Sequence, residues 1–340
     1  MKTDTPSYIA RPEDKEFYER ELASFIPDKV FDAHTHVWHS NHCQFPEQFP
    51  PVVDYQTYLT LMEDIHPGRI TKALFIPTFR DPQSSNPIRP RPSFITDANQ
   101  WTSDQTAKDQ NCRGHFFIKP DDDPEWVRQE VKRLGLCGLK CYHSLSLNPE
   151  STFEAQIPDY LPETLIKVAH EEEWTITLHM VRARAAADPG NIHWIRHYCE
   201  NYPKMQLILA HSARGFQPAH NLEGLPQLTG LDNLWFDTSA NCEAMAHQAI
   251  IRIIGHDKLL YGGDLPVTHG RGRSLGVQDS FLWLYEDSPV WGEKHQSIKP
   301  VFTGLEHLRS IKWACWSENL TDNQIEDIFW NNAAKLFRLS

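Results

Sequence analysis

The sequence predicts an α/β fold, a (β/α)8 TIM barrel in a single domain, with a long insert after the eighth strand and a C-terminal helix. Near-continuous apolar segments alternate with amphipathic segments of helical period, which is typical of a parallel sheet covered by helices. Eight such apolar segments occur, and eight parallel strands of this kind suggest a closed barrel. A length of 340 residues is common for one barrel domain.

The predicted strands follow one another at residues 29–37, 71–77, 114–120, 138–142, 174–180, 205–211, 234–238 and 258–264. Apolar residues recur with a period near 3.6 at 55–65, 124–134, 159–171, 191–201 and 242–254, which predicts helices there. The segment 39–51 contains histidines and several prolines and is predicted to be an irregular loop.

Three segments are predicted to lie outside this alternation. Residues 1–28 form a polar N-terminal extension, in which the mixed-charge run 11–21 suggests an exposed helix. Residues 265–320 form an insert rich in glycine, tryptophan and charge, and a connection this long is usually functional or contains structure of its own, here a lid, an oligomer contact or both. A capping-box pattern from Thr321 to Gln324 predicts the start of the final helix, 321–338.

Composition narrows the expected partners. The net charge is −12 and no basic block stands out, which argues against nucleic-acid binding. No apolar stretch is long enough to span a bilayer and no export signal is evident, so we expect a soluble protein without a membrane partner. Seven cysteines without C-x-x-C spacing indicate a reducing compartment, and a cytoplasmic location is expected. The tryptophan-rich insert and the frequency of symmetric oligomers suggest a homodimer.

Potential metal ligands and proton carriers lie at the ends of four predicted strands: His34, His36, His179, His211 and Asp264. The one-residue spacing of the first two places both imidazoles on one face of a strand. The carboxyl ends of barrel strands converge on one mouth, so these side chains are expected to meet there. Imidazoles and a carboxylate suit zinc or another first-row divalent ion, which would lower the pKa of a water molecule.

The ordered motifs resemble the metal-dependent amidohydrolase superfamily, in its amidohydrolase-related (amidohydrolase 2) branch. The resemblance is carried by D-A-H-T-H at 32–36, G-L-K-C-Y at 138–142, T-L-H-M at 177–180, L-A-H-S at 209–212, Y-G-G-D-L-P at 261–266 and F-W-N-N-A-A-K-L-F-R-L at 329–339. It implies that His34, His36, His179 and Asp264 surround a single metal ion. It also implies that His211 acts as acid or base or orients substrate, and that Asp264 shuttles a proton.

These features predict a hydrolase that attacks a lactone, ester or amide of a small, carboxylate-bearing substrate. One divalent ion is expected, zinc first and manganese second, with no organic cofactor. Arginine suits carboxylate binding, and the candidates are Arg80, Arg182, Arg184 and Arg214, although each could instead form a structural ion pair. Lys140 either pairs with a substrate carboxylate or a buried acid or, as in some superfamily branches, is carboxylated and bridges two metals.

Two alternatives remain open. The same branch contains non-oxidative decarboxylases, which release carbon dioxide, and lactonases that work without a divalent ion. A barrel that has lost catalysis and serves as a binding module is the other alternative, since fold does not imply function. The remaining polar residues are given lesser roles: loop or surface positions for His39, His42, His143 and His193, a place at the barrel bottom or in a turn for Asp32, and either role for Asp237.

Overall fold

The structure is a computed structural model that describes residues 6–45, 49–83, 90–148, 151–291, 295 and 298–339. Parts of the predicted N-terminal extension (1–5), of the predicted loop (46–48) and of the predicted insert (292–294 and 296–297) lie outside the described residues.

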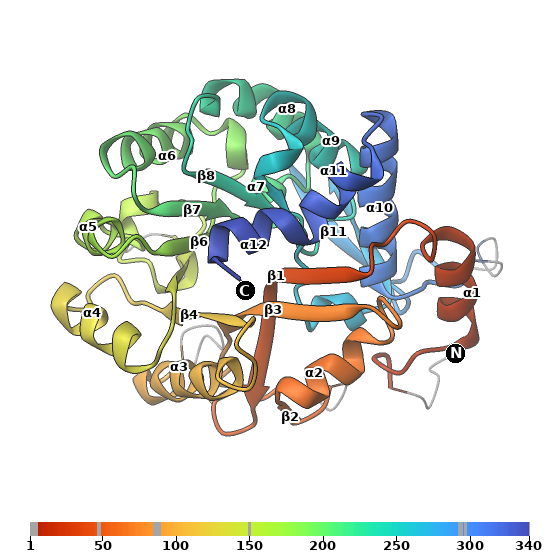
Figure 1. Ribbon diagram of the computed structural model, residues 1–340, viewed down its shortest axis with the longest axis horizontal. Helices are drawn as coiled ribbons and strands as arrows, with labels where there is room; N and C mark the ends of the chain where they lie inside the picture. Colours follow the sequence, from red (N-terminus) through yellow and green to blue (C-terminus); the bar gives the residue numbers. More distant parts are fainter. Residues whose placement is uncertain are drawn as a thin grey trace.

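The described residues form a curled, mostly parallel sheet surrounded by helices, which confirms the predicted α/β barrel (Figure 1). Its parallel strands are β1 (Lys29–His39), β3 (Ile70–Pro77), β4 (Arg113–Phe117), β5 (Gly138–Tyr142), β6 (Thr175–His179), β7 (Gln206–Leu209), β8 (Leu234–Asp237) and β9 (Leu259–Leu260), in this spatial order. A short strand, β2 (Val52–Val53), pairs antiparallel with the end of β1. The N–H of Ala33 donates to the carbonyl of Tyr261 over 2.8 Å, which joins the last part of the sheet to the first.

The helices lie outside this sheet (Figure 1). They are α1 (Pro12–Glu21), α2 (Tyr55–Met62), α3 (Pro92–Thr106), α4 (Pro124–Arg133), α5 (Glu163–Glu171), α6 (Pro189–Asn201), α8 (Pro218–Gly224), α9 (Ala244–Ile253) and α10 (Thr303–Ser317). Helix α3 was not predicted, because its Ser, Thr, Asp and Asn residues have low helix propensity. Across the described ranges, no helix has the length and apolar character needed to cross a membrane.

The predicted insert contains regular structure. It holds a two-stranded hairpin, β10 (Gly272–Val277) and β11 (Ser280–Tyr285), followed by α10, which packs against α9. Its first part is anchored to the N-terminal extension by Arg271, which is 1% exposed and forms an ion pair of 2.8 Å with the equally buried Asp14 of α1. The prediction of an exposed helix at 11–21 was therefore wrong for the face of α1 that carries Asp14, Phe17 and Tyr18.

The chain ends in a helical segment that closes one end of the barrel. It begins at the predicted capping box on Thr321 and consists of α11 (Asp322–Glu326), a π-helical turn at 327–331 and α12 (Asn332–Phe337), where a single helix was predicted. Phe337 and Ala333 of α12 join interior side chains of the strands, and Phe337 stacks on Phe31 with ring centroids 5.4 Å apart. Figure 1 shows α12 lying across the ring of strands.

A β-bulge in β1 aims the two predicted metal-site histidines into the barrel. Asp32 is paired with Ala73 of β3, but the next paired residue, Thr35, faces Phe75, so one extra residue is inserted in β1. Such a bulge reverses which residues face inward. Ala33 therefore points into the apolar layer at the bottom of the barrel, whereas His34 and His36 line the cavity at its top.

Several buried histidines make the fold sensitive to acid. Burial lowers the pKa of His66, His247 and His269 to about 4, below the value of about 6.5 for an exposed histidine. Between these values only the unfolded chain binds the proton, so stability falls as the pH drops from about 6.5 to about 4, by up to about 1.4 kcal/mol per pH unit for each residue. Urea unfolding at pH 7, 6 and 5 should show this loss, and His66→Phe should reduce the slope while exposed His193→Phe leaves it unchanged. An unfolding free energy that is flat over this range would contradict the prediction.

Candidate active site

A cavity of about 250 Å³ opens where the barrel strands end. Its described lining combines titratable and apolar side chains: His34, His36, Phe45, Pro77, Thr78, Phe79, Arg80, Phe117, Lys140, Tyr142, His179, His211 and Asp264. All five residues predicted for the metal and proton chemistry thus lie around one cavity. The geometry of each decides what the set can bind.

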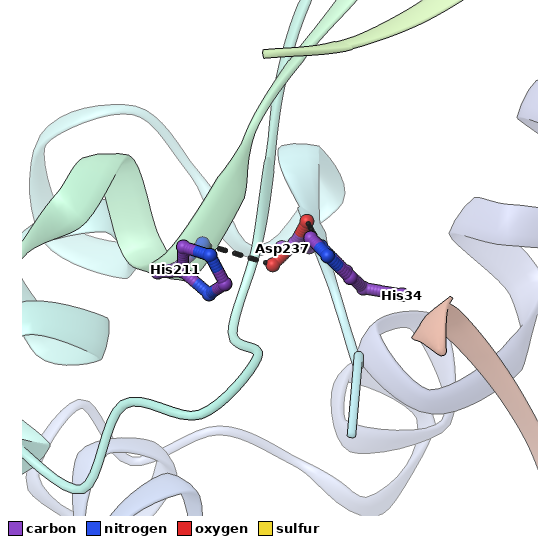
Figure 2. Close-up of side chains that lie close together, drawn as sticks. All are labelled: His34, His211 and Asp237. Atoms are coloured by element: carbon purple, nitrogen blue, oxygen red, sulfur yellow. Dashed lines mark hydrogen bonds and ion pairs between the residues drawn. The ribbon is translucent and has the colours of Figure 1, made fainter. Parts of the chain in front are cut away.

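His34 is oriented by Asp237, at the end of β8. Nδ1 of His34 lies 2.9 Å from Oδ2 of this carboxylate, while Oδ1 accepts hydrogen bonds from the N–H groups of His211 and Ser239, each over 3.0 Å. Figure 2 shows the Asp237 carboxylate between the side chains of His34 and His211. Because a carboxylate only accepts, Nδ1 of His34 is assigned the proton, and its Nε2 keeps a lone pair.

His36 and Asp264 face each other as two acceptors. Nδ1 of His36 lies 2.8 Å from the carbonyl of Ile76, so it is assigned the proton and Nε2 carries the lone pair. That Nε2 lies 3.2 Å from Oδ1 of Asp264. An imidazole lone pair and a carboxylate oxygen at this distance repel each other, and either a proton on Nε2 or a divalent metal ion between the two atoms would remove that repulsion.

His211 pairs directly with His179. The sequence placed His211 at the end of a strand, but β7 ends at Leu209 and His211 lies in the turn that follows. Nδ1 of His211 lies 3.1 Å from the carbonyl of Ser239 and is assigned the proton, so its Nε2 accepts from Nδ1 of His179, 3.1 Å away. This leaves the other nitrogen of His179, Nε2, with a lone pair for a metal ion or a substrate proton.

The turn that carries His211 is left-handed. Its four residues, His211, Ser212, Ala213 and Arg214, have φ values of 58°, 53°, 57° and 54°. A left-handed conformation costs about 1–2 kcal/mol per residue with a Cβ atom. Strain of this size persists only where surrounding contacts hold it, and it concentrates at functional sites.

Burial and neighbouring charges set the protonation states. Burial, with the charge of Lys140, lowers the pKa of His34 to about 4, and burial lowers the pKa of His179 and His211 as well. Burial alone would raise the pKa of Asp264, but the nearby rings of His36, His34 and His211, the first at hydrogen-bond distance, outweigh this and bring it below its usual value. Neutral imidazoles beside an ionised carboxylate are the states that bind a metal.

The donor set fits a divalent ion. His34, His36 and Asp264 each offer a ligand atom, and these atoms lie within 4.8 Å of one another. A second such group in the described structure, His34, His211 and Asp237, shares His34, but the oxygens of Asp237 are already engaged by hydrogen bonds. His179 lines the same cavity without belonging to either group, so its role as a fourth ligand stays a prediction.

The cationic side chains separate into two sets. Arg80 and Lys140 line the cavity, and no carboxylate within the described ranges forms an ion pair with either of them. Lys140 is only 3% exposed, and its Nζ lies 3.4 Å from Nε2 of His34. Burial lowers its pKa, while Asp237 and Asp264 act in the opposite direction. Its carboxylation stays a prediction.

The other three predicted arginines are absent from the described lining of the cavity. Arg182 forms an ion pair of 3.0 Å with Asp188, and Arg184 pairs with Glu223. The Arg214 guanidinium donates to the carbonyl of Met180 over 3.3 Å. Their proposed contact with substrate stays a prediction.

The sequence did not reveal several features in and around the site. His42 and His143, assigned to loop or surface positions, are not among the described residues that line the cavity, but each is only 2% exposed, and His143 lies beside His179 with ring centroids 5.7 Å apart. Asp237 was ambiguous, although it follows an apolar strand as Asp264 does. The apolar wall formed by Phe45, Phe79 and Phe117 carried no recognisable motif.

A family model described as Amidohydrolase matches residues 31–339. The chain belongs to the amidohydrolase family. No curated protein matches the chain. The matched range includes all five predicted site residues, from His34 to Asp264.

Solved structures share the fold of this chain at low sequence identity. An amidohydrolase from Burkholderia multivorans with bound HEPES has a TM-score of 0.58 at 11% identity, over 92% of this chain and 100% of that chain. A probable 2-pyrone-4,6-dicarboxylic acid hydrolase from Acinetobacter baumannii with bound citric acid has a TM-score of 0.53 at 15% identity, over 92% and 100%. A 5-carboxyvanillate decarboxylase mutant from Novosphingobium aromaticivorans with bound manganese has a TM-score of 0.51 at 15% identity, over 85% and 82%.

Proposed function

We propose that this amidohydrolase is a metal-dependent hydrolase that cleaves a lactone, ester or amide in a small substrate bearing a carboxylate. The observation that carries the proposal is the presence, in one cavity, of the group His34, His36 and Asp264 together with two cationic side chains that lack an ion-pair partner among the described residues. The first set suits a divalent ion, zinc in our proposal, and the second suits a substrate anion.

The cationic pair defines the substrate end of the site. A buried ammonium without a carboxylate partner is costly, so a bound anion near Lys140 would offset that cost. Arg80 is held at the mouth because its backbone N–H donates to the carbonyl of His42 and its carbonyl accepts from the N–H of Gln44, both over 3.1 Å. Phe45, Phe79 and Phe117 supply apolar surface between the two ends, which fits a flat unsaturated acid.

The residues that would hold the ion are His34, His36 and Asp264, with His179 as the fourth. A bound divalent ion would polarise the scissile carbonyl and lower the pKa of the attacking water. Asp264, ionised and facing the cavity, takes the proton from that water and passes it to the leaving group. His211 holds the neutral tautomer of His179 through its Nε2, and Arg80 and Lys140 orient the carboxylate of the substrate.

Decarboxylation is the second candidate. The likeness to the 5-carboxyvanillate decarboxylase is nearly as high as the likeness to the pyrone hydrolase, and both proteins act on carboxylates. A carboxylate held near Lys140 could be either the anchor of the substrate or the group that leaves. The product that the enzyme releases therefore decides between the two candidates.

The first experiment measures the metal content of the purified protein and its turnover of 2-pyrone-4,6-dicarboxylate and 5-carboxyvanillate, within a panel of lactones, esters and amides. We expect about one ion per chain, lost in His34→Ala and kept in the control His193→Ala, and hydrolysis without carbon dioxide, with consumption of base where the active compound is a lactone or ester. Carbon dioxide release would favour the decarboxylase. A metal-free His34→Ala/His179→Ala protein with full activity would contradict the proposal of a metal-dependent enzyme. Metal binding without turnover of any panel compound would favour a barrel that only binds a ligand.

Loss of the Arg80 guanidinium should weaken substrate binding more than turnover. We expect Arg80→Met to raise KM for the active panel compound about tenfold or more, because a charge-assisted hydrogen bond contributes about 1.5–3 kcal/mol, and to leave kcat within about threefold. Steady-state kinetics checks this. Arg184→Met serves as the matched control, since Arg184 is paired with Glu223, and its KM should stay unchanged. Equal KM values in both variants would exclude Arg80 as the anion anchor.

A further inference from the structure

We propose that Asn221 and His247 are positioning residues for the metal site. They hold the left-handed turn 211–214 in the shape that brings Nε2 of His211 to the Nδ1–H of His179, which leaves Nε2 of His179 free for a divalent ion. The inference rests on the proposed function, because it takes His179 as a ligand. Neither Asn221 nor His247 is among the described residues that line the cavity.

Side chains form hydrogen bonds with the backbone of the turn at successive positions. The N–H of His211 donates to Oδ1 of Asp237 over 3.0 Å, and the carbonyl of His211 accepts from Nδ2 of Asn241 over 3.2 Å. The carbonyl of Ser212 accepts from Nδ2 of Asn221 over 2.9 Å. These side chains thus add to the backbone hydrogen bonds of the turn, in which the N–H of Gly215 lies 3.0 Å from the carbonyls of both His211 and Ser212.

Asn221 reaches the turn from α8 because Gly215 leaves room for it. Asn221 is fully buried, and its Nδ2 also lies 3.3 Å from the carbonyl of Ala246 in α9. A Cβ atom built on Gly215 would lie only 2.6 Å from that Nδ2. Asn221 therefore links the turn to α8 and α9 through a contact that only glycine at position 215 permits.

His247, which lies on α9, holds the side chain of Ser212 in the turn. Nε2 of His247 lies 3.0 Å from the carbonyl of Asn241, so it is assigned the proton, and Nδ1 accepts from the hydroxyl of Ser212 over 2.8 Å. Burial lowers the pKa of His247 to about 4, so the ring is neutral at pH 7. The fully buried ring of His247 joins the loop after β8, through Asn241, to the turn.

The shape of the turn affects the metal site through the hydrogen bond between His211 and His179. A histidine ligand is oriented by the partner of its other ring nitrogen, and loss of such a partner typically weakens metal binding 10–100-fold. If the turn relaxes, Nε2 of His211 moves away from Nδ1 of His179 and the tautomer of His179 is no longer fixed. The residues that hold the turn should therefore affect zinc binding without touching the ion.

The test makes two measurements: the tautomers of the histidine rings in the metal-free protein, and the affinity of the protein for zinc. In protein labelled with ¹⁵N-histidine, two-bond ¹H–¹⁵N spectra report the tautomers of His179 and His211, assigned with His179→Gln and His211→Gln. We expect Asn221→Ala to replace the single Nδ1–H tautomer by a mixture and to weaken Zn²⁺ binding, measured against a chromophoric chelator, about tenfold or more. Adding Ala213→Gly should restore both readouts, because glycine adopts positive φ without support.

The control is Asn201→Ala, which removes an asparagine on the surface of α6 and should change neither readout. Ring signals that stay unchanged in a folded Asn221→Ala protein would overturn the proposal, and so would a failure of Ala213→Gly to restore them. If Asn221→Ala does not fold, Ser212→Ala, which removes only the hydrogen bond to His247, takes its place with the same expected outcomes.

Zinc affinity separates this inference from the proposed function. Altered ring signals with unchanged zinc affinity would overturn the ligand role of His179 and this part of the proposed function, while leaving the turn as the support of His211. An unaltered protein that binds no zinc would overturn the proposed function, and the ring signals alone would then decide whether Asn221 positions His211.

Discussion

Asp264→Asn should lower kcat of the active panel compound by about 10²–10⁴-fold, the range typical of losing a positioned acid or base. The Asp264 carboxylate faces Nε2 of His36 and lies 3.8 Å from Nδ1 of His211, and its lowered pKa keeps it ionised at neutral pH. An amide in the same place cannot take up a proton from water. Single-turnover kinetics of the purified variant, with its metal content measured in parallel, checks the prediction.

The control is Asp232→Asn, which alters an exposed carboxylate outside the cavity and should leave kcat unchanged. Because the pKa of Asp264 lies below its usual value, protonation of Asp264 should not contribute to any loss of activity within the ordinary titration range of a carboxyl group. An Asp264→Asn protein that keeps its metal and most of its kcat would show that another group accepts the proton.

Arg271→Met should lower the free energy of unfolding by about 3–5 kcal/mol, because it leaves the Asp14 carboxylate buried without its counter-charge. The guanidinium of Arg271 forms two hydrogen bonds to Asp14, of 3.0 and 2.8 Å, and donates to the carbonyls of Ser7 and Ile9. It also lies over the ring of Phe302, with its central carbon 4.4 Å from the ring centroid. Equilibrium unfolding in urea, followed by tryptophan fluorescence, measures the loss.

Removing both charges tests the cause of that loss. Arg271→Met combined with Asp14→Leu should be more stable than Arg271→Met alone, since the unpaired carboxylate is gone. The matched surface control is Arg20→Met, which removes exposed ion pairs on α1 and should leave the unfolding midpoint within experimental error. A double variant no more stable than the single one would mean that packing, and not the buried charge, determines the cost.

The barrel was predictable because its strands are buried on both faces and therefore read as apolar runs. The same logic placed His34, His36 and Asp264 at one mouth. The sequence pattern did not predict α3, whose polar and β-branched residues form a helix only because tertiary packing overrides their low helix propensity. It also failed at Leu259–Leu260, where the predicted strand 258–264 shortens and Asp264 adopts a positive φ of 69°.

The details of the site were harder to predict for a physical reason. Ser212, Ala213 and Arg214 do not favour positive φ, so no residue type announced the left-handed turn. The roles of Asp237 and Ser239 depend on which atoms they meet across the barrel, which spacing along one strand cannot give. His143 resembled a loop residue because it follows β5, and its burial beside His179 arises from the fold of the segment after it.

The position of α12 has a consequence for folding. Phe337 and Ala333 fill the apolar layer at the bottom of the barrel together with side chains that lie far away in the sequence, such as Phe31 and Leu74. A chain in which all eight strands have formed but α12 has not docked would therefore expose this layer to water. Such an intermediate would be prone to aggregation.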